Sequence, residues 1–263
     1  MSVGIGIVCP GAILVASDSQ ITDLCTGTFD TVQKIRGIES KFSRLLIIQC
    51  GLWPFTNRVI DIMQEKVQRL DNTSPEVIKR LIEDCIREAK APLDEEQQIF
   101  VNSNPSQIIA AFYSEKTPYL CRFETHGVGI GVDSSQHFIT GGCGAFLSDY
   151  LLSEYLTTEA PIDVAVALAI YAIKKVKDRT KFCGGDTVVK LLFPIFMGQL
   201  QFQYVARWQP IDKQIIALAE SELDAADKKT RTLRRLEFNS IITAVAERIH
   251  SQREENRNDR PHQ

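Results

Sequence analysis

The chain has 263 residues, of which 44% are apolar, and it carries a formal net charge of −3 at pH 7. This balance lacks the basic footprint on which nucleic-acid binders depend, so we expect no nucleic-acid partner. The longest nearly apolar stretch, residues 162–173, is too short to span a bilayer, and the chain opens without a basic signal-peptide region. We therefore expect a cytoplasmic protein that makes no contact with a membrane.

Cysteine and histidine usage indicates reduced thiols and no metal site. The seven cysteines are odd in number, contain no C-x-x-C pair and lie mostly in apolar runs, as buried thiols do. The four histidines are scattered and lack the spacing of metal ligands. The sequence thus predicts neither a metal nor another cofactor.

The first two predicted strands, at residues 2–9 and 12–18, carry candidate catalytic residues. Ser2 opens the first strand, Asp18 closes the second, and Lys34 follows sixteen residues later. If Met1 is removed, the α-amino group of Ser2 has an ordinary pKa of about 7.7–8.0 and can accept the proton of its own hydroxyl. A lysine nearby would keep that amine neutral, and an aspartate beside the lysine would keep the lysine charged.

A buried strand at 44–50 ends at Gly51, just before a helix that includes residues 58–70. A backbone N–H at such a turn can stabilise the oxyanion of an acyl-transfer reaction. A glycine in this place can also serve only to let the chain turn, and both interpretations of Gly51 stay open. A second helix follows, with Ser74 as N-cap and Pro75 at its first position.

Strands and helices continue along the rest of the chain. We expect strands at 107–113, 118–124 and 137–140, helices at 144–156 and 161–177, and strands at 187–193 and 199–205. Two amphipathic helices are predicted at 211–226 and 233–249, and the polar residues 251–263 are expected to be disordered. This order favours an antiparallel sandwich with its helices outside.

The spacing of Ser2, Asp18 and Lys34, with the segment Ala16-Ser-Asp-Ser-Gln-Ile-Thr22, resembles the proteasome β-subunit family and its bacterial relative, the HslV protease. Those proteins begin with a catalytic threonine, where this chain has serine. The resemblance extends over about residues 2–205 and implies an α+β fold, the four-layer αββα sandwich of N-terminal-nucleophile hydrolases. It divides the chain into a proteasome-like domain at 1–208, a helical extension at 209–250 and the polar tail at 251–263.

The resemblance also implies roles for residues around the nucleophile. Gly51 would donate its N–H to the oxyanion. The side chains expected to flank the substrate pocket are Ile21, Val32, Gln49 and Trp53.

Two further segments match the family less well. Gly142 stands where the family has a serine that orients the nucleophile. Thr180 and Cys183 stand where it has an aspartate and a serine. Asp178, two residues upstream of Thr180, is a candidate to supply the missing carboxylate.

The function implied by the resemblance is a peptidase that forms an acyl-enzyme on Ser2. It would act on peptides or unfolded proteins inside a homo-oligomeric ring, with an ATP-dependent unfoldase as a candidate partner. Two alternatives stay open. One is a non-catalytic ring or scaffold subunit, which Gly142 and Thr180 favour, and the other is an amidase acting on small acyl-amides. The extension at 209–250 would pack either on its own body or on a neighbouring subunit.

Overall fold

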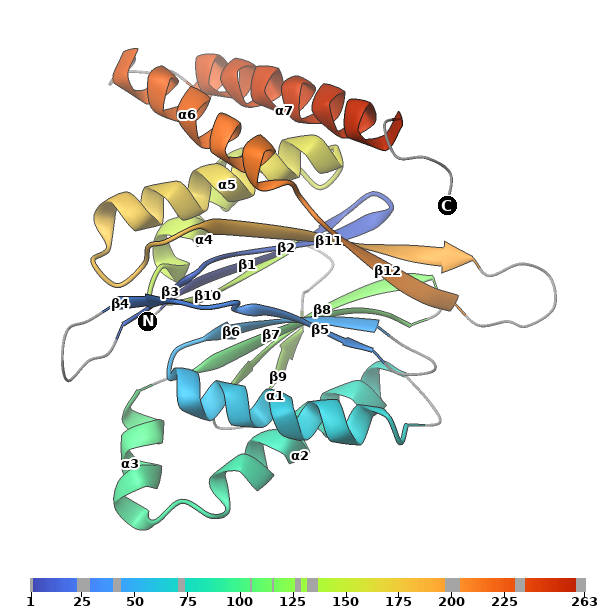
Figure 1. Ribbon diagram of the computed structural model, residues 1–263, viewed down its shortest axis with the longest axis vertical. Helices are drawn as coiled ribbons and strands as arrows, with labels where there is room; N and C mark the ends of the chain where they lie inside the picture. Colours follow the sequence, from blue (N-terminus) through green and yellow to red (C-terminus); the bar gives the residue numbers. More distant parts are fainter. Residues whose placement is uncertain are drawn as a thin grey trace.

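Two antiparallel sheets lie face to face at the centre of the molecule (Figure 1). The computed structural model describes residues 2–22, 29–39, 44–70, 74–104, 106–114, 116–125, 129–131, 137–196, 204–229 and 235–258. The first sheet has the strand order β10-β1-β2-β11-β12. These strands are β10 (Phe138–Gly142), β1 (Val3–Cys9), β2 (Ala12–Asp18), β11 (Thr187–Phe196) and β12 (Tyr204–Pro210).

The second sheet has the order β5-β6-β7-β8-β9, and a separate two-stranded ribbon pairs β3 with β4. The strands of the second sheet are β5 (Ile35–Glu39), β6 (Arg44–Cys50), β7 (Gln107–Ser114), β8 (Thr117–Glu124) and β9 (Gly129–Gly131). The ribbon consists of β3 (Gln20–Thr22) and β4 (Phe29–Thr31). It extends directly from β2, so the residues that follow Asp18 stay close to the first sheet.

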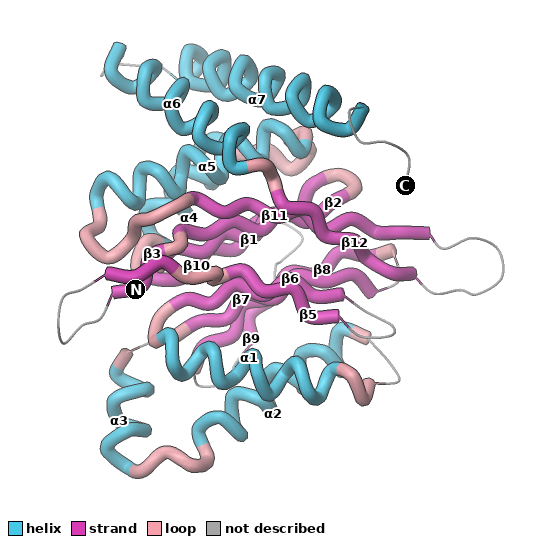
Figure 2. Tube along the Cα trace, in the orientation of Figure 1, coloured by secondary structure: helices cyan, strands magenta, loops and turns pink. Residues whose placement is uncertain are grey.

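Helices cover the outer face of each sheet (Figure 2). The second sheet is covered by α1 (Trp53–Val67) and α2 (Pro75–Lys90), with α3 (Glu95–Ser103) beside them. The first sheet is covered by α4 (Ala145–Tyr155) and α5 (Ile162–Arg179). The layers therefore run helix, sheet, sheet, helix, which confirms the predicted α+β sandwich.

Alternating side chains fill the layers on both sides of the second sheet. In β6, Leu46 and Ile48 point toward the first sheet. Leu45 and Ile47 point the opposite way, toward α1 and α2. Because successive strand residues face opposite sides and both sides are covered, β6 is apolar from Leu45 to Ile48.

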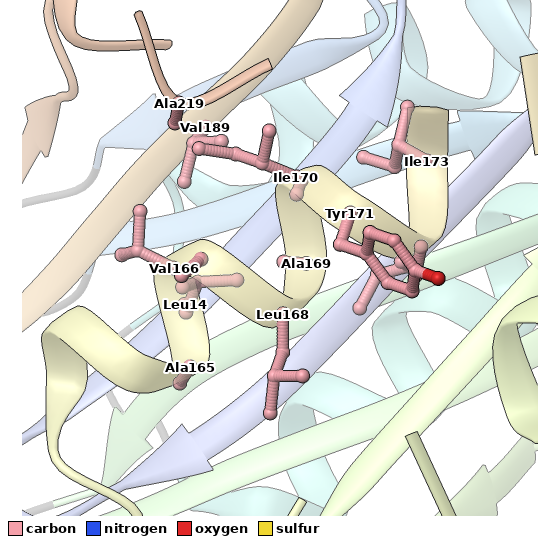
Figure 3. Close-up of a cluster of buried hydrophobic side chains, with 14 of the residues drawn as sticks. Leu14, Ala165, Val166, Leu168, Ala169, Ile170, Tyr171, Ile173, Val189 and Ala219 are labelled. Carbon is pink, nitrogen blue, oxygen red and sulfur yellow. The ribbon is translucent and has the colours of Figure 1, made fainter. Parts of the chain in front are cut away.

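Helix α5 is buried almost all round, as its apolar sequence predicts. Residues 165–173 are all buried. Figure 3 shows this helix with Leu14 of β2, Val189 of β11 and Ala219 of the following helix, α6, around it. The helix is therefore enclosed between the first sheet and the C-terminal part of the chain.

The C-terminal helices α6 (Lys213–Lys229) and α7 (Arg235–Asn258) pack on the body of their own chain. Their buried residues belong to the same cluster as those of α5, among them Ile215, Leu223, Ile242 and Ile249. Two ion pairs join α5 to α6, Lys174 with Asp224 and Lys177 with Glu220, each at 2.8 Å. Of the two arrangements left open for this extension, the structure shows the one on its own body.

Several boundaries differ from the prediction. The expected disorder of 251–263 is wrong for 251–258, where α7 continues because Arg253 pairs with Asp163 of α5; residues 259–263 lie outside the described residues. Strand β12 runs to residue 210, so the sheet extends past the expected domain boundary at 208. The first residues of the strand expected at 199–205 also lie outside the described residues. None of the described helices is both long and apolar enough to cross a membrane.

Candidate active site

Ser2 lies at the start of a strand in the interior of the first sheet, and its exposed fraction is 1%. Strand β1 pairs on one side with β10, where Val3 faces Gly142, and on the other side with β2, where Gly4 faces Ser17. The antiparallel register places the end of β2 beside the start of β1. Asp18, the last residue of β2, therefore lies next to the residue that follows Ser2.

A buried ion pair lies beside Ser2. Lys34 Nζ donates to Asp18 Oδ1 at 2.8 Å, and the two side chains are only 2% and 0% exposed. The same carboxylate oxygen accepts from the backbone N–H of Val3 at 2.9 Å, and Oδ2 accepts from the N–H of Gly184 at 3.1 Å. Two buried charges cost several kcal/mol each unless they are paired and hydrogen-bonded, and these donors meet that requirement. Asp18 thus links the Lys34 ammonium through two hydrogen bonds to the backbone N–H of Val3, the residue after Ser2.

The backbone N–H of Gly51 donates to Ser2 Oγ at 3.2 Å. Gly51 has a φ of +104°, and a Cβ there would lie 2.6 Å from the Cα of Ser106, so only glycine fits. Ser106 Oγ accepts from the N–H of Leu52 at 2.9 Å and holds the turn. The two interpretations of Gly51 are thus compatible, since the turn is what aims the N–H at the serine oxygen.

Cys143 also contacts Ser2, and the sequence analysis missed this residue. Its thiol donates to the carbonyl oxygen of Ser2, with a distance of 3.4 Å from sulfur to oxygen. A Cβ on Gly142 would lie 2.0 Å from that same oxygen, so Gly142 has no room for a side chain. The polar side chain that meets Ser2 in this segment is therefore one residue later than expected. Aligning the middle of Gly142-Cys-Gly144 with the family's serine would have found it.

Cys143 and Cys183 lie together, with their sulfur atoms 3.3 Å apart. The hydrogen bond from Cys183, and the contact with the backbone of Ser2, lower the pKa of the Cys143 thiol to about 7 despite its partial burial. The same hydrogen bond, together with burial, raises the pKa of Cys183. Cys50 is buried close to Ser2, and burial raises its pKa to about 12. Cys143 is therefore the most easily ionised of these three thiols.

The other residues expected near the nucleophile do not reach it through any hydrogen bond or ion pair found in the described part of the chain. Asp178 lies on α5 and is 3.8 Å from Lys174, because the helix continues through Arg179 and keeps the carboxylate on its surface. The structure therefore does not bring Asp178 to the site around Ser2. Thr180 ends α5 and accepts the backbone N–H of Cys183 through its carbonyl oxygen at 3.2 Å.

Of the residues expected to flank the substrate pocket, Gln49 and Trp53 lie on either side of the turn before α1. Gln49 is buried and accepts from Thr56 Oγ1 at 3.2 Å, while its amide nitrogen finds no partner among the described residues. Trp53 is half-buried at the start of α1. Ile21 and Val32 are half-buried as well, on β3 and just after β4. Their joint role as a pocket stays a prediction.

No group of three or more histidine, cysteine, aspartate or glutamate side chains that could hold a metal ion occurs within the described ranges. The described site thus consists of a hydroxyl, an ion pair, a backbone donor and two thiols. Acyl transfer uses groups of these kinds: a hydroxyl as nucleophile, a cation that favours a neutral base and a backbone N–H as oxyanion donor.

The family model of the proteasome subunit matches residues 2–192. The chain belongs to the proteasome subunit family. No match was found among curated proteins. The matched range contains every residue just placed around Ser2 and ends within β11, so α6 and α7 lie beyond the part of the chain that the family model matches.

Solved structures of three proteins have the same fold as this proteasome-family chain. Anbu (ancestral beta-subunit) from Yersinia bercovieri has a TM-score of 0.69 and 12% identity, covering 88% of this chain and 98% of its own. Anbu from Pseudomonas aeruginosa, in a helical assembly, has a TM-score of 0.69 and 15% identity, covering 88% and 97%. Anbu from Hyphomicrobium sp. strain MC1 has a TM-score of 0.67 and 13% identity, covering 88% and 98%.

Proposed function

We propose that this chain is an N-terminal-nucleophile peptidase in which Ser2, freed by removal of Met1, attacks the carbonyl carbon of a peptide bond. The observation that carries the proposal is the arrangement around Ser2: the buried Lys34–Asp18 pair binds the N–H of the next residue, Val3, and the N–H of Gly51 donates to Ser2 Oγ. Membership of the proteasome subunit family supports the class of reaction.

The α-amine of Ser2 acts as the general base in the proposed mechanism. It accepts the hydroxyl proton as the Oγ–carbon bond forms, and it returns that proton to the leaving amine as the peptide C–N bond breaks. The Lys34 ammonium opposes a second positive charge nearby and so keeps the amine in its neutral, basic form. Water then hydrolyses the ester on Ser2 by the same route and restores the free hydroxyl.

Gly51 supplies the oxyanion donor in the proposed mechanism. Its N–H donates to Ser2 Oγ in the structure, and the carbonyl oxygen that becomes negative is two bonds from Oγ once the carbonyl carbon is attached. A fixed donor of this kind is worth about 3–4 kcal/mol of transition-state stabilisation. The positive φ at Gly51 holds the donor in place before the substrate arrives.

We also propose that the chain works as a homo-oligomer. Helix α4 exposes two aromatic side chains one turn apart, Phe146 (87% exposed) and Tyr150 (61% exposed), which a second copy of the chain would cover. A relative of the same fold is described as a helical assembly. A head-to-tail contact closes into a ring or grows into a helix according to its rotation, so electron microscopy of the purified protein distinguishes the two. The unfoldase partner is a prediction of the resemblance alone.

A non-catalytic scaffold subunit is the second candidate function. It is favoured by Asp178, which pairs with Lys174 outside the site, and by Cys143 and Cys183, which replace hydroxyl groups of the family with thiols. An inactive scaffold would keep the fold and the assembly but would show no turnover.

Intact-mass spectrometry and a substrate panel test the proposal. We expect the purified protein to lack Met1 and to carry an unmodified Ser2, because the mechanism needs a free amine. We expect hydrolysis of fluorogenic peptides that the Ser2→Ala variant abolishes. A retained Met1 or an acetylated Ser2 contradicts the mechanism, turnover of small acyl-amides alone identifies the amidase, and no turnover from a correctly processed protein favours the scaffold.

A further inference from the structure

Two cysteines from distant parts of the chain meet beside the start of β1. Cys143 lies in the short segment between β10 and α4, and Cys183 lies between α5 and β11. Their sulfur atoms are 3.3 Å apart, and the Cys143 sulfur is also 3.4 Å from the carbonyl oxygen of Ser2. Cys143 is exposed, whereas Cys183 is buried.

The two sulfur atoms are near enough to each other for a disulfide bond to form after a small movement. A disulfide has an S–S length of about 2.05 Å, so the two sulfur atoms need to move roughly 1 Å closer together. Both cysteines lie outside the helices and strands, so side-chain rotation and small loop adjustments can close this gap without disturbing the sheet.

We propose that Cys143 and Cys183 form a reversible disulfide beside Ser2, with a peroxide as the oxidant. The exposed Cys143 thiolate is the group that reacts first, and the buried Cys183 is the group that resolves the product. The geometry favours this order, because a peroxide reaches Cys143 from solvent and then finds Cys183 directly behind it.

The proposed chemistry balances with hydrogen peroxide as follows. The Cys143 thiolate attacks one peroxide oxygen, the O–O bond breaks, and the released hydroxide takes up a proton to leave as water. The product is a sulfenic acid on Cys143. The Cys183 sulfur attacks the Cys143 sulfur, its proton leaves with the hydroxyl as a second water, and the S–S bond forms. The two thiols lose two electrons and the peroxide gains them.

The disulfide also changes the surroundings of Ser2, and this consequence rests on the proposed function. An oxidised Cys143 has no S–H to donate to the Ser2 carbonyl, so the hydrogen bond at 3.4 Å is lost. A hydrogen bond of ordinary net strength corresponds to a rate factor of about five-fold. We therefore expect acylation of Ser2 by an electrophilic inhibitor to be about five-fold slower in the oxidised protein.

Peptide mapping tests the pair directly and does not depend on any activity. The full chain, reduced and carrying Cys25→Ser because Cys25 lies outside the described residues, is treated with hydrogen peroxide, alkylated with N-ethylmaleimide and digested without reductant. We expect a peptide pair joined between Cys143 and Cys183, lighter by two hydrogens and separated again by dithiothreitol. The matched control Cys121→Ser removes another buried thiol, and this variant still forms the link.

The Cys183→Ser variant gives an independent measure of the same proposal. Without the resolving thiol, Cys143 should be trapped by dimedone as the sulfenic acid and then pass to the sulfinic acid. Direct oxidation of Cys143 to sulfinic acid in the unmutated chain, or full alkylation of both cysteines after peroxide treatment, overturns the proposal. If the link forms but Ser2 labels in neither redox state, the thiol pair stands and the proposed function fails.

Discussion

Lys34 is a residue whose burial is hard to explain without a role at Ser2. Lysine is rarely buried unless it is paired, and a buried ion pair often stabilises a protein no more than apolar residues of the same volume would. Here the pair lies against the backbone that follows Ser2, and both carboxylate oxygens accept N–H donors. The free-energy cost of burying these two charges is therefore compatible with a catalytic role of the Lys34 ammonium.

The Lys34→Met variant separates this role from stability. We expect the rate of Ser2 acylation by an electrophilic inhibitor to fall by about a hundred-fold or more, because the base is no longer held neutral. We also expect the free energy of unfolding to fall by about 3–5 kcal/mol, because Asp18 is left charged and buried. Inhibitor kinetics and urea unfolding measure the two effects.

Lys190 provides a matched control for Lys34. It is also buried, and its ammonium donates to the carbonyl oxygen of Ile35 at 3.0 Å. The Lys190→Met variant should change stability and leave acylation of Ser2 unchanged. The double variant Lys34→Met with Asp18→Asn removes both charges, so it should regain stability without regaining acylation. Recovery of acylation in the double variant would refute the role of Lys34.

Cys143 should show a pH dependence different from that of an ordinary thiol. Its pKa is lowered from 9.0 to about 7 by the hydrogen bond from Cys183, while the nearby Asp18 carboxylate acts in the opposite direction. Because only the thiolate reacts, the rate of alkylation with iodoacetamide should rise with pH and be half-maximal at about 7. In the Cys183→Ala variant, which removes the hydrogen-bond donor, the midpoint should move upward toward 9; an unchanged midpoint would contradict the assigned cause.

Strands β10, β1 and β2 position the residues of the site. The close approach of Gly142 to the backbone of Ser2 determines how β10 and β1 pack at this point. Its φ of +85° excludes most side chains, and a Cβ would lie 2.0 Å from the carbonyl oxygen of Ser2. Gly11, in the turn between β1 and β2, has a similar φ of +78° but has no atom within 4 Å of its Cβ position. Both glycines therefore have a left-handed backbone conformation, but only at Gly142 would a Cβ also collide with neighbouring atoms.

Alanine substitutions at these two glycines measure the crowding at the start of β1. Gly11→Ala should cost about 1–2 kcal/mol of unfolding free energy, the cost of a left-handed backbone with a Cβ. Gly142→Ala should cost more than this and should also slow acylation of Ser2, because the Ser2 backbone must move. Equal losses of stability in urea titrations would show that Ser2 is not held by this contact.

Much of the fold and part of the site were predictable from the sequence, for identifiable physical reasons. Residues Ser2, Asp18 and Lys34 were associated by their spacing, and the strands with continuous apolar runs, such as β6, were recognised. Strand β5 was missed because its sequence, Ile35-Arg-Gly-Ile-Glu39, buries only two side chains. Cys143 was missed through a shift of one residue, because Gly142 and not Cys143 was aligned with the family's serine.

Helices α6 and α7 follow the part of the chain that the family model matches, which ends at residue 192. They enclose α5, whose apolar surface would otherwise face solvent, and the pairing of Asp163 with His250 at 3.0 Å adds a polar contact at the rim. The far end of α7 was expected to be disordered because its composition is polar. Tertiary contacts with α5 outweigh that local preference.

Ile249 tests whether α7 packs on its own chain in solution. It is buried in the cluster shared with α5, so Ile249→Ala should lower the free energy of unfolding by about 2–5 kcal/mol. The exposed neighbour Glu247, changed to alanine, should have an effect within about 0.5 kcal/mol. Thermal unfolding at several protein concentrations should give the same loss; a loss that varies with concentration would place α7 against another subunit instead.

The most direct test of the account is the site of acylation by an electrophilic proteasome inhibitor. After incubation of the processed protein with a peptide vinyl sulfone, digestion and tandem mass spectrometry locate the adduct. We predict a single adduct on the oxygen of Ser2, at one equivalent per chain, which the Ser2→Ala variant fails to form and the Lys34→Met variant forms about a hundred-fold more slowly. An adduct only on Cys143, or no adduct on a protein whose Ser2 amine is free, would contradict the assignment of Ser2 as the nucleophile.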